Sequence, residues 1–167
     1  MLLFRLNAWA FGYFEWAAAV ISWVFLPAAV RLLSVMLLGR RGAMGLWIGT
    51  LITNEAVFGG DKFESIAVAT LSATGPLVAV YLTMRWLKVP LNLRGLTTPH
   101  LTIFAIVGAF CNVIPHNLFF WLAGITPNPF GGLIPMFVGD VAGTVIVLYT
   151  LRGLLVASGR FVRFPTV

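Results

Sequence analysis

The sequence predicts an all-α, polytopic membrane helix bundle, and three observations support this fold class. The 167-residue chain is 60% hydrophobic and 10% charged, with a mean hydropathy of +0.98. Five long apolar segments and one short one fill it, and a helix needs ~20 such residues to cross a ~30 Å hydrocarbon core. Most basic residues fall in the connections on one side of these segments. A water-soluble domain would expose more polar surface, so we expect a single transmembrane domain over 1–167 and no soluble domain.

The apolar segments follow one another with short connections. The first is expected from about Ala8 to Leu26 and carries Glu15 near its middle. Pro27 then interrupts the chain, and the next helix, over 28–38, reaches only ~17 Å at 1.5 Å per residue. Such a half-helix or strongly tilted helix is tolerated only if protein covers its broken end. The remaining segments are 42–58, 63–87, 99–124 and 133–155, of which the second and third contain prolines that predict kinks.

Basic residues in the connections predict the orientation, because cytoplasmic loops of membrane proteins are enriched in Lys and Arg. With the N-terminus inside, the inner side holds Arg5, Arg40, Arg41, Arg85, Lys88, Arg94, Arg152, Arg160 and Arg163. Lys62 alone lies outside, and Arg31 remains within the short segment. This bias predicts about six crossings of a bacterial cytoplasmic membrane with both termini in the cytoplasm. It also explains the net charge of +6 without a nucleic-acid partner.

Polar side chains inside the apolar segments mark a candidate ligand site, because a charge at a helix centre costs about 2.5–3.5 kcal/mol on insertion scales. The candidates, all in the predicted outer half of the membrane or at its outer edge, are Arg31, Asn54, Glu55, His116, Asn117 and Asp140. Arg31 would be the positive element of a small outward-open pocket, because its planar fork binds carboxylates, with Asp140 or Glu55 as its partner. The alternatives are an Arg31 that snorkels to the interface, a structural hydrogen bond for Asp140 and an interfacial carboxylate at Glu55.

Metal binding and enzyme activity are not expected from these residues. His100 and His116 lie sixteen residues apart, ~24 Å along one helix, and the single Cys111 adds little to a ligand set. No nucleophile with a base and no phosphate-binding glycine loop stands out. The six tryptophans lie mostly near segment ends, as in interfacial aromatic belts. Stacking on pigments or quinones is an alternative, so the sequence leaves open whether a cofactor is bound.

Three patches of the chain combine proline, glycine and charged residues in a recognisable pattern. The first, over 25–41, is a proline-started apolar helix ending in Leu-Leu-Gly-Arg-Arg, followed by Gly49 and Asn54. The second, over 137–143, is Phe-Val-Gly-Asp-Val-Ala-Gly, and the third is the helix over 70–87 with its basic, leucine-rich end. Together these patches resemble the MASE1 family of bacterial membrane-associated sensory domains, over about half of the chain.

The resemblance implies a sensor-like fold with Asp140 in its pocket, and the chain departs from the family in several ways. Members usually have about eight spans and precede a cytoplasmic output domain, which is not expected here. Ala-Thr-Gly-Pro over 73–76 stands where a polar Asn-Thr-Leu-Glu is often found, and Phe137 replaces a common Trp.

Two functional hypotheses are nearly level at this point. The first is a non-enzymatic MASE1-like module that senses or binds a small ligand from the outer side and acts through another membrane protein. The second is a structural or accessory subunit of a larger membrane complex, such as a bioenergetic one. Gly42, Gly45 and Gly49 form a face for close helix contact, within the bundle or with such a partner. A component of a small-solute transporter is a third possibility, because broken helices and buried charges also suit transport.

Overall fold

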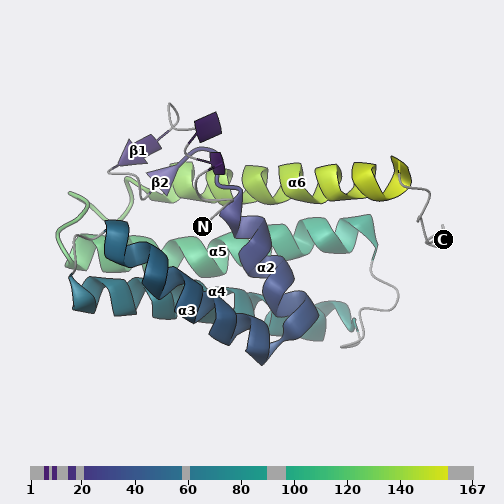
Figure 1. The fold of residues 1–167 in the computed structure, drawn as a ribbon, viewed down its shortest axis with the longest axis horizontal. Coiled ribbons are helices and arrows are strands. Elements are labelled where there is room, and N and C mark those ends of the chain that lie inside the picture. Colours follow the sequence, from purple (N-terminus) through teal and green to yellow (C-terminus); the bar gives the residue numbers. More distant parts are fainter. Residues whose placement is uncertain are drawn as a thin grey trace.

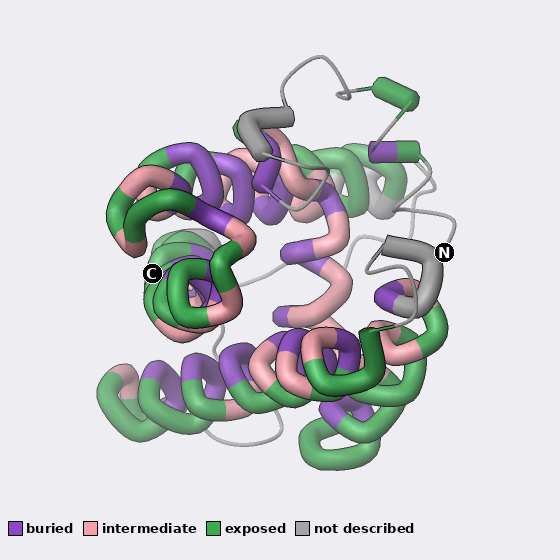
Figure 2. The backbone as a smooth tube through the Cα atoms, turned by 90° about the vertical axis from the view of Figure 1, so that its left-hand side faces the viewer, coloured by how far each residue is buried: buried purple, intermediate pink, exposed green. Residues whose placement is uncertain are grey.

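The computed structural model describes residues 6–7, 9–10, 15–17, 21–57, 61–89 and 97–157. Its elements are β1 (Glu15–Ala17), β2 (Ile21–Ser22), α2 (Pro27–Leu38), α3 (Arg40–Val57), α4 (Lys62–Leu87), α5 (Thr98–Leu122) and α6 (Leu133–Ala157). The helices α4, α5 and α6 lie side by side and run in alternating directions, and α2 and α3 cross them obliquely (Figure 1). In the end view of Figure 2 the buried stretches of the helices face the inside of the bundle. The described residues therefore form a helical bundle with one small β-hairpin.

Within the described residues, three helices are long and apolar enough to cross a membrane, namely Lys62–Leu87, Pro99–Leu122 and Leu133–Leu151. Their outward faces carry large apolar side chains, such as Tyr81 on α4, Phe110 on α5 and Tyr149 on α6. These faces suit lipid better than water, which supports the prediction of a membrane protein. The six crossings predicted are more than the structure shows.

The predicted first span over 8–26 is wrong as a continuous helix. Glu15, expected in the middle of that span, lies in β1, which pairs antiparallel with β2. Aromatic and β-branched residues are frequent in this stretch, and they favour strands. Hydropathy alone does not separate an apolar segment that covers a bundle from one that crosses a membrane. Both predicted cytoplasmic termini lie outside the described residues.

The short helix α2 has the covered end that the sequence requires. Pro27 occupies its first turn, where a missing N–H costs nothing. Just before it, the Leu26 N–H donates to Asn7 Oδ1 (2.8 Å) and the Phe25 N–H donates to the Gly139 carbonyl (3.0 Å). At the other end Gly39, with φ of 56°, turns the chain directly into α3. The broken end of α2 thus lies against α6 and is satisfied by protein.

A layer of buried polar residues separates two apolar clusters inside the bundle. One cluster, near the α2–α3 turn, contains Leu32, Val35, Met36, Ala43, Val80, Met84 and Phe104. The other, near β2, contains Ile21, Val68, Val113, Phe120 and Met136. Ser72 on α4 and Asn112 on α5 lie between them along the chain, and both side chains are buried. Such residues need partners inside the bundle, which makes this layer the place to look for a site.

Lys62 and Lys88 are expected to face opposite sides of the membrane. They lie at the two ends of α4, whose 26 residues span ~39 Å at 1.5 Å per residue. In a Cys111→Ala background, a membrane-impermeant thiol reagent should label Lys62→Cys in intact cells. It should label Lys88→Cys only after permeabilisation, because Lys88 lies at the basic end of the bundle. Equal labelling of both positions from one side would contradict this topology.

Candidate functional site

Asn112 brings Arg31, which is half-buried, and Asp140, which is buried, into one cluster. The Arg31 Nη1 donates to Asn112 Oδ1 (3.3 Å), and Asn112 Nδ2 donates to Asp140 Oδ2 (2.7 Å). The three residues come from α2, α5 and α6, and Asp140 is only 3% exposed. Arg31 and Asp140 also attract each other electrostatically. The cluster therefore holds two opposite charges joined by a neutral amide, with no net charge.

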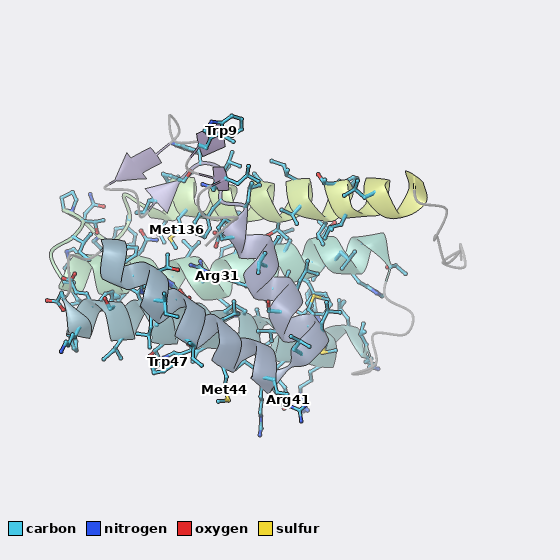
Figure 3. All side chains as sticks on the ribbon, viewed as in Figure 1. Trp9, Arg31, Arg41, Met44, Trp47 and Met136 are labelled. Atoms are coloured by element: carbon cyan, nitrogen blue, oxygen red, sulfur yellow. The ribbon has the colours of Figure 1, made fainter. Side chains whose placement is uncertain are left out.

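Arg31 lies inside the bundle and does not snorkel to the interface. In Figure 3 it is near the middle of the bundle, whereas Arg41 extends from one end. The guanidinium also lies 5.1 Å from the centre of the Phe25 ring, within the range of a cation–π interaction. Because α2 starts in mid-bundle, its first turns place Arg31 opposite Asn112. The predicted positive element is thus next to Asp140, one of its two predicted partners.

One carboxylate oxygen of Asp140 lacks a hydrogen-bond partner. Asp140 Oδ1 is buried and accepts no hydrogen bond, although buried polar atoms in proteins are nearly always paired. Asp140 and Arg31 both line a hollow between α2, α4, α5 and α6. The hollow leaves about 20 Å³ for the centre of a water-sized sphere, and about 290 Å³ of empty space including its open mouth. This is enough for a water molecule or a few ligand atoms next to the Asp140 side chain.

Small side chains create the hollow. Its remaining lining is Ala28 and Leu32 from α2, Pro76 from α4, Ala105, Gly108, Ala109 and Asn112 from α5, and Thr144 from α6. Pro76 lies in the interior of α4, where its ring removes a helical hydrogen bond. Gly108 has only Leu32 within reach of an added Cβ, at 3.4 Å, so the space beside it is open. The walls are apolar, and the polar groups are concentrated at one place.

His116 lies one helical turn from Asn112 and beside the hollow. Its Nδ1 donates to the Asn112 carbonyl (2.8 Å), and its Nε2 lies 3.3 Å from the Ser72 hydroxyl. With Nδ1 as the donor, the Nε2 of a neutral ring accepts from Ser72. His116 is 2% exposed, so it joins α5 to α4 within the polar layer. It is not among the residues that line the hollow.

Asn54 and Asn117, which were predicted for the same pocket, make contacts elsewhere in the bundle. Asn54 Nδ2 donates to the Ser65 carbonyl (3.1 Å), which joins α3 to α4. Asn117 Nδ2 donates to the Val113 carbonyl (3.0 Å) and contacts Met136 Sδ (3.4 Å). Neither lines the hollow. The structure thus brings together Arg31 and Asp140 with His116 close by, and the side chain of Glu55 lies outside the described part.

Asn112 is the residue that the sequence analysis missed. Its place in an apolar segment, four residues before His116, was the available signal, because residues at this spacing share one face of a helix. An amide has four hydrogen-bonding sites and no charge, so it can join a cation to an anion. Here it does so with both ends of its side chain.

The cluster suits binding and orientation of a polar molecule. It offers the guanidinium as a donor, the Asp140 carboxylate as an acceptor and an apolar wall around both. In the ranges that the structure describes, no group of three His, Cys, Asp or Glu side chains is placed to hold a metal ion.

Comparison with known proteins adds no family to this site. No protein-family model matches the chain, and neither the search of curated proteins nor that of solved structures finds a significant similarity. The resemblance to MASE1 domains therefore stays a prediction that depends on the three sequence patches.

Proposed function

We propose that this chain is a non-enzymatic, MASE1-like membrane module that binds a small ligand from the outer side and acts through a membrane partner. The observation that supports it is the Arg31–Asn112–Asp140 cluster, with the unpaired Asp140 Oδ1 buried at a hollow. Charges within membrane helices are costly and often mark functional sites. An unpaired carboxylate oxygen adds to that cost. Ligand binding accounts for both features, because the ligand supplies the missing donor.

Entry from the outer side is supported by where the cluster lies along α6. Asp140 is seven residues from Leu133 at the start of α6 and seventeen from Ala157 at its end. These separations correspond to ~10 Å and ~25 Å along the helix. The nearer end joins the uncharged connection over 123–132, whereas the α2–α3 turn and the end of α4 are basic. We place the basic end in the cytoplasm of a bacterial inner membrane.

The same placement gives four full crossings, by α3, α4, α5 and α6, and one half crossing by α2. The 18-residue helix α3 is ~27 Å long, close to the thickness of the hydrocarbon core. We propose that it crosses beside α4, α5 and α6, and that α2 crosses only half of the membrane. An arrangement of this kind keeps Arg40, Arg85 and Lys88 on one side and Lys62 on the other.

Thermal unfolding of the purified protein with a broad panel of small polar compounds tests the binding function. At a hundred times its Kd, a ligand should raise the Tm by about 5–10 °C, because it stabilises only the folded state. Asp140→Asn and Arg31→Ala should abolish this increase. Glu64→Gln and Arg85→Ala, which remove the same charges near the ends of α4, should keep it. No increase with any compound, or an increase that persists in Asp140→Asn, would contradict the proposal.

A second candidate, an accessory subunit of a larger membrane complex, is favoured by one feature of α3. Gly45 and Gly49 lie four residues apart, and an added Cβ at either would meet nothing within 4 Å. Small residues at this spacing let a neighbouring membrane helix approach closely. Met44 beside them points away from the bundle (Figure 3), whereas Trp47 Nε1 donates to Thr70 Oγ1 on α4 (3.2 Å). This face would suit the membrane partner in either candidate function.

A further inference from the structure

We infer that the hollow binds a small dipolar molecule, with a hydrogen-bond acceptor at one end and an N–H donor at the other. The amino and carboxylate groups of a small zwitterionic amino acid have this chemistry. The inference rests on the proposed function, because it specifies the ligand class of the same site.

The charges of the hollow select against simple ions. Arg31 and Asp140 both line it, and Asn112 holds them in one cluster. An anion is attracted by Arg31 and repelled by Asp140, whereas a cation is attracted by Asp140 and repelled by Arg31. These opposing effects are strong in a bundle interior, where water screens little. A dipolar molecule gains from both charges, because each of its ends meets the opposite charge.

The hydrogen bonds of the cluster point to the same ligand class. Asp140 Oδ2 accepts a hydrogen bond from Asn112 Nδ2. Asp140 Oδ1 has no donor, so it can accept one from an ammonium or amide N–H. The bond to Asn112 uses one of the five N–H groups of Arg31, and a guanidinium fork suits a carboxylate. Asn112 is hydrogen-bonded to both Arg31 and Asp140 and so fixes the distance between them. That distance in turn sets the spacing between the acceptor and donor ends of the ligand.

The size of the hollow limits the ligand to a few heavy atoms. It leaves about 20 Å³ for the centre of a water-sized sphere, only slightly more than the ~10–15 Å³ that one water needs. Ala28, Ala105, Gly108 and Ala109 provide this room. Valine at 108 would occupy part of it while leaving the charged residues in place. We therefore choose glycine as the probe.

The test compares glycine with acetate and methylammonium, which each carry one of its two charges. Binding to the protein in lipid nanodiscs is measured by thermal shift and by isothermal titration. Glycine should bind at least tenfold more tightly than either ion. Gly108→Val should weaken glycine binding at least tenfold. Gly45→Val makes the same substitution at an open position of α3, and it should leave binding unchanged.

Each outcome has a distinct meaning. If acetate or methylammonium binds as tightly as glycine, and Asp140→Asn abolishes that binding, the dipolar class is wrong and the proposed function stands. If none of the three binds, or if Gly108→Val binds glycine like the wild type, the inference is overturned. The broad compound panel then decides separately whether the chain binds any small ligand. The comparison of Gly108→Val with Gly45→Val keeps the test valid if Asp140→Asn does not fold.

Discussion

Arg31→Met is expected to destabilise the protein by about 3–5 kcal/mol, because it leaves a buried carboxylate without its opposite charge. Asp140 is 3% exposed and lies inside the bundle, where a few water molecules cannot fully compensate for the loss of the guanidinium charge. The substitution also removes the donor to Asn112 Oδ1, which is 3.3 Å from Arg31 Nη1. Methionine has a similar length, so the loss of packing is small compared with the loss of charge pairing.

The double variant Arg31→Met/Asp140→Leu should recover most of that stability. Replacing both opposite charges by apolar residues leaves no charge without a partner, and for buried ion pairs such a double replacement is often neutral or stabilising. Reversible unfolding of all four proteins in mixed detergent micelles gives the coupling energy, expected to be about 3 kcal/mol or more because the double variant recovers most of what Arg31→Met loses. Arg85→Met, at an exposed position of α4, is the control and should change stability by about 0.5 kcal/mol or less. Additive effects of the two single substitutions would show that Arg31 and Asp140 do not depend on each other.

Recovery in the double variant would also separate stability from function. Real proteins depart from the most stable choice mainly at functional sites, and ligand binding is the function that we propose for this pair of charges. The double variant should therefore be folded and should show no response to ligands.

The helical bundle could be predicted from sequence because its signals are local. Long apolar segments, the stop at Pro27 and the turn at Gly39 each act on neighbouring residues. The half-helix was predicted for the same reason, and so was the need for protein to cover its end. The segment over 8–26 was wrongly predicted to be a continuous helix, because a membrane span and a hairpin that covers a bundle can have the same apolar composition.

The composition of the site could be predicted only in part, because it depends on how helices far apart in the chain are rotated. Arg31 and Asp140 are conspicuous as charges in apolar segments, whatever their orientation. The sequence alone does not rank three asparagines as members of the site, namely Asn54, Asn112 and Asn117. Only the rotation of α3 and α5 decides which of them faces the hollow. Asn112 faces it and Asn54 does not, a difference without any local signal.

The second large effect is expected at Gly139 and Gly143 on α6, which let the chain before α2 pass in close contact. A Cβ on Gly139 would meet the carbonyl oxygen of Ser22. A Cβ on Gly143 would meet the carbonyl oxygen of Phe25 and lie 2.7 Å from the Leu26 nitrogen. These neighbours are backbone atoms, which cannot rotate away as the end of a side chain can. The Phe25 N–H also donates to the Gly139 carbonyl across the same contact.

Gly143→Leu should therefore lower the free energy of unfolding by about 3 kcal/mol or more, at the upper end of what overpacking costs. Because the contact positions the start of α2, the substitution should also displace Arg31 and abolish the response to ligand. Gly153→Leu on the same helix, where an added Cβ meets nothing within 4 Å, is the matched control and should leave both unchanged. Unfolding in mixed micelles and ligand-induced thermal shift measure the two effects. A Gly143→Leu protein as stable as Gly153→Leu would mean that the chain before α2 does not lie against α6, and Arg31 would then lose its placement beside Asp140.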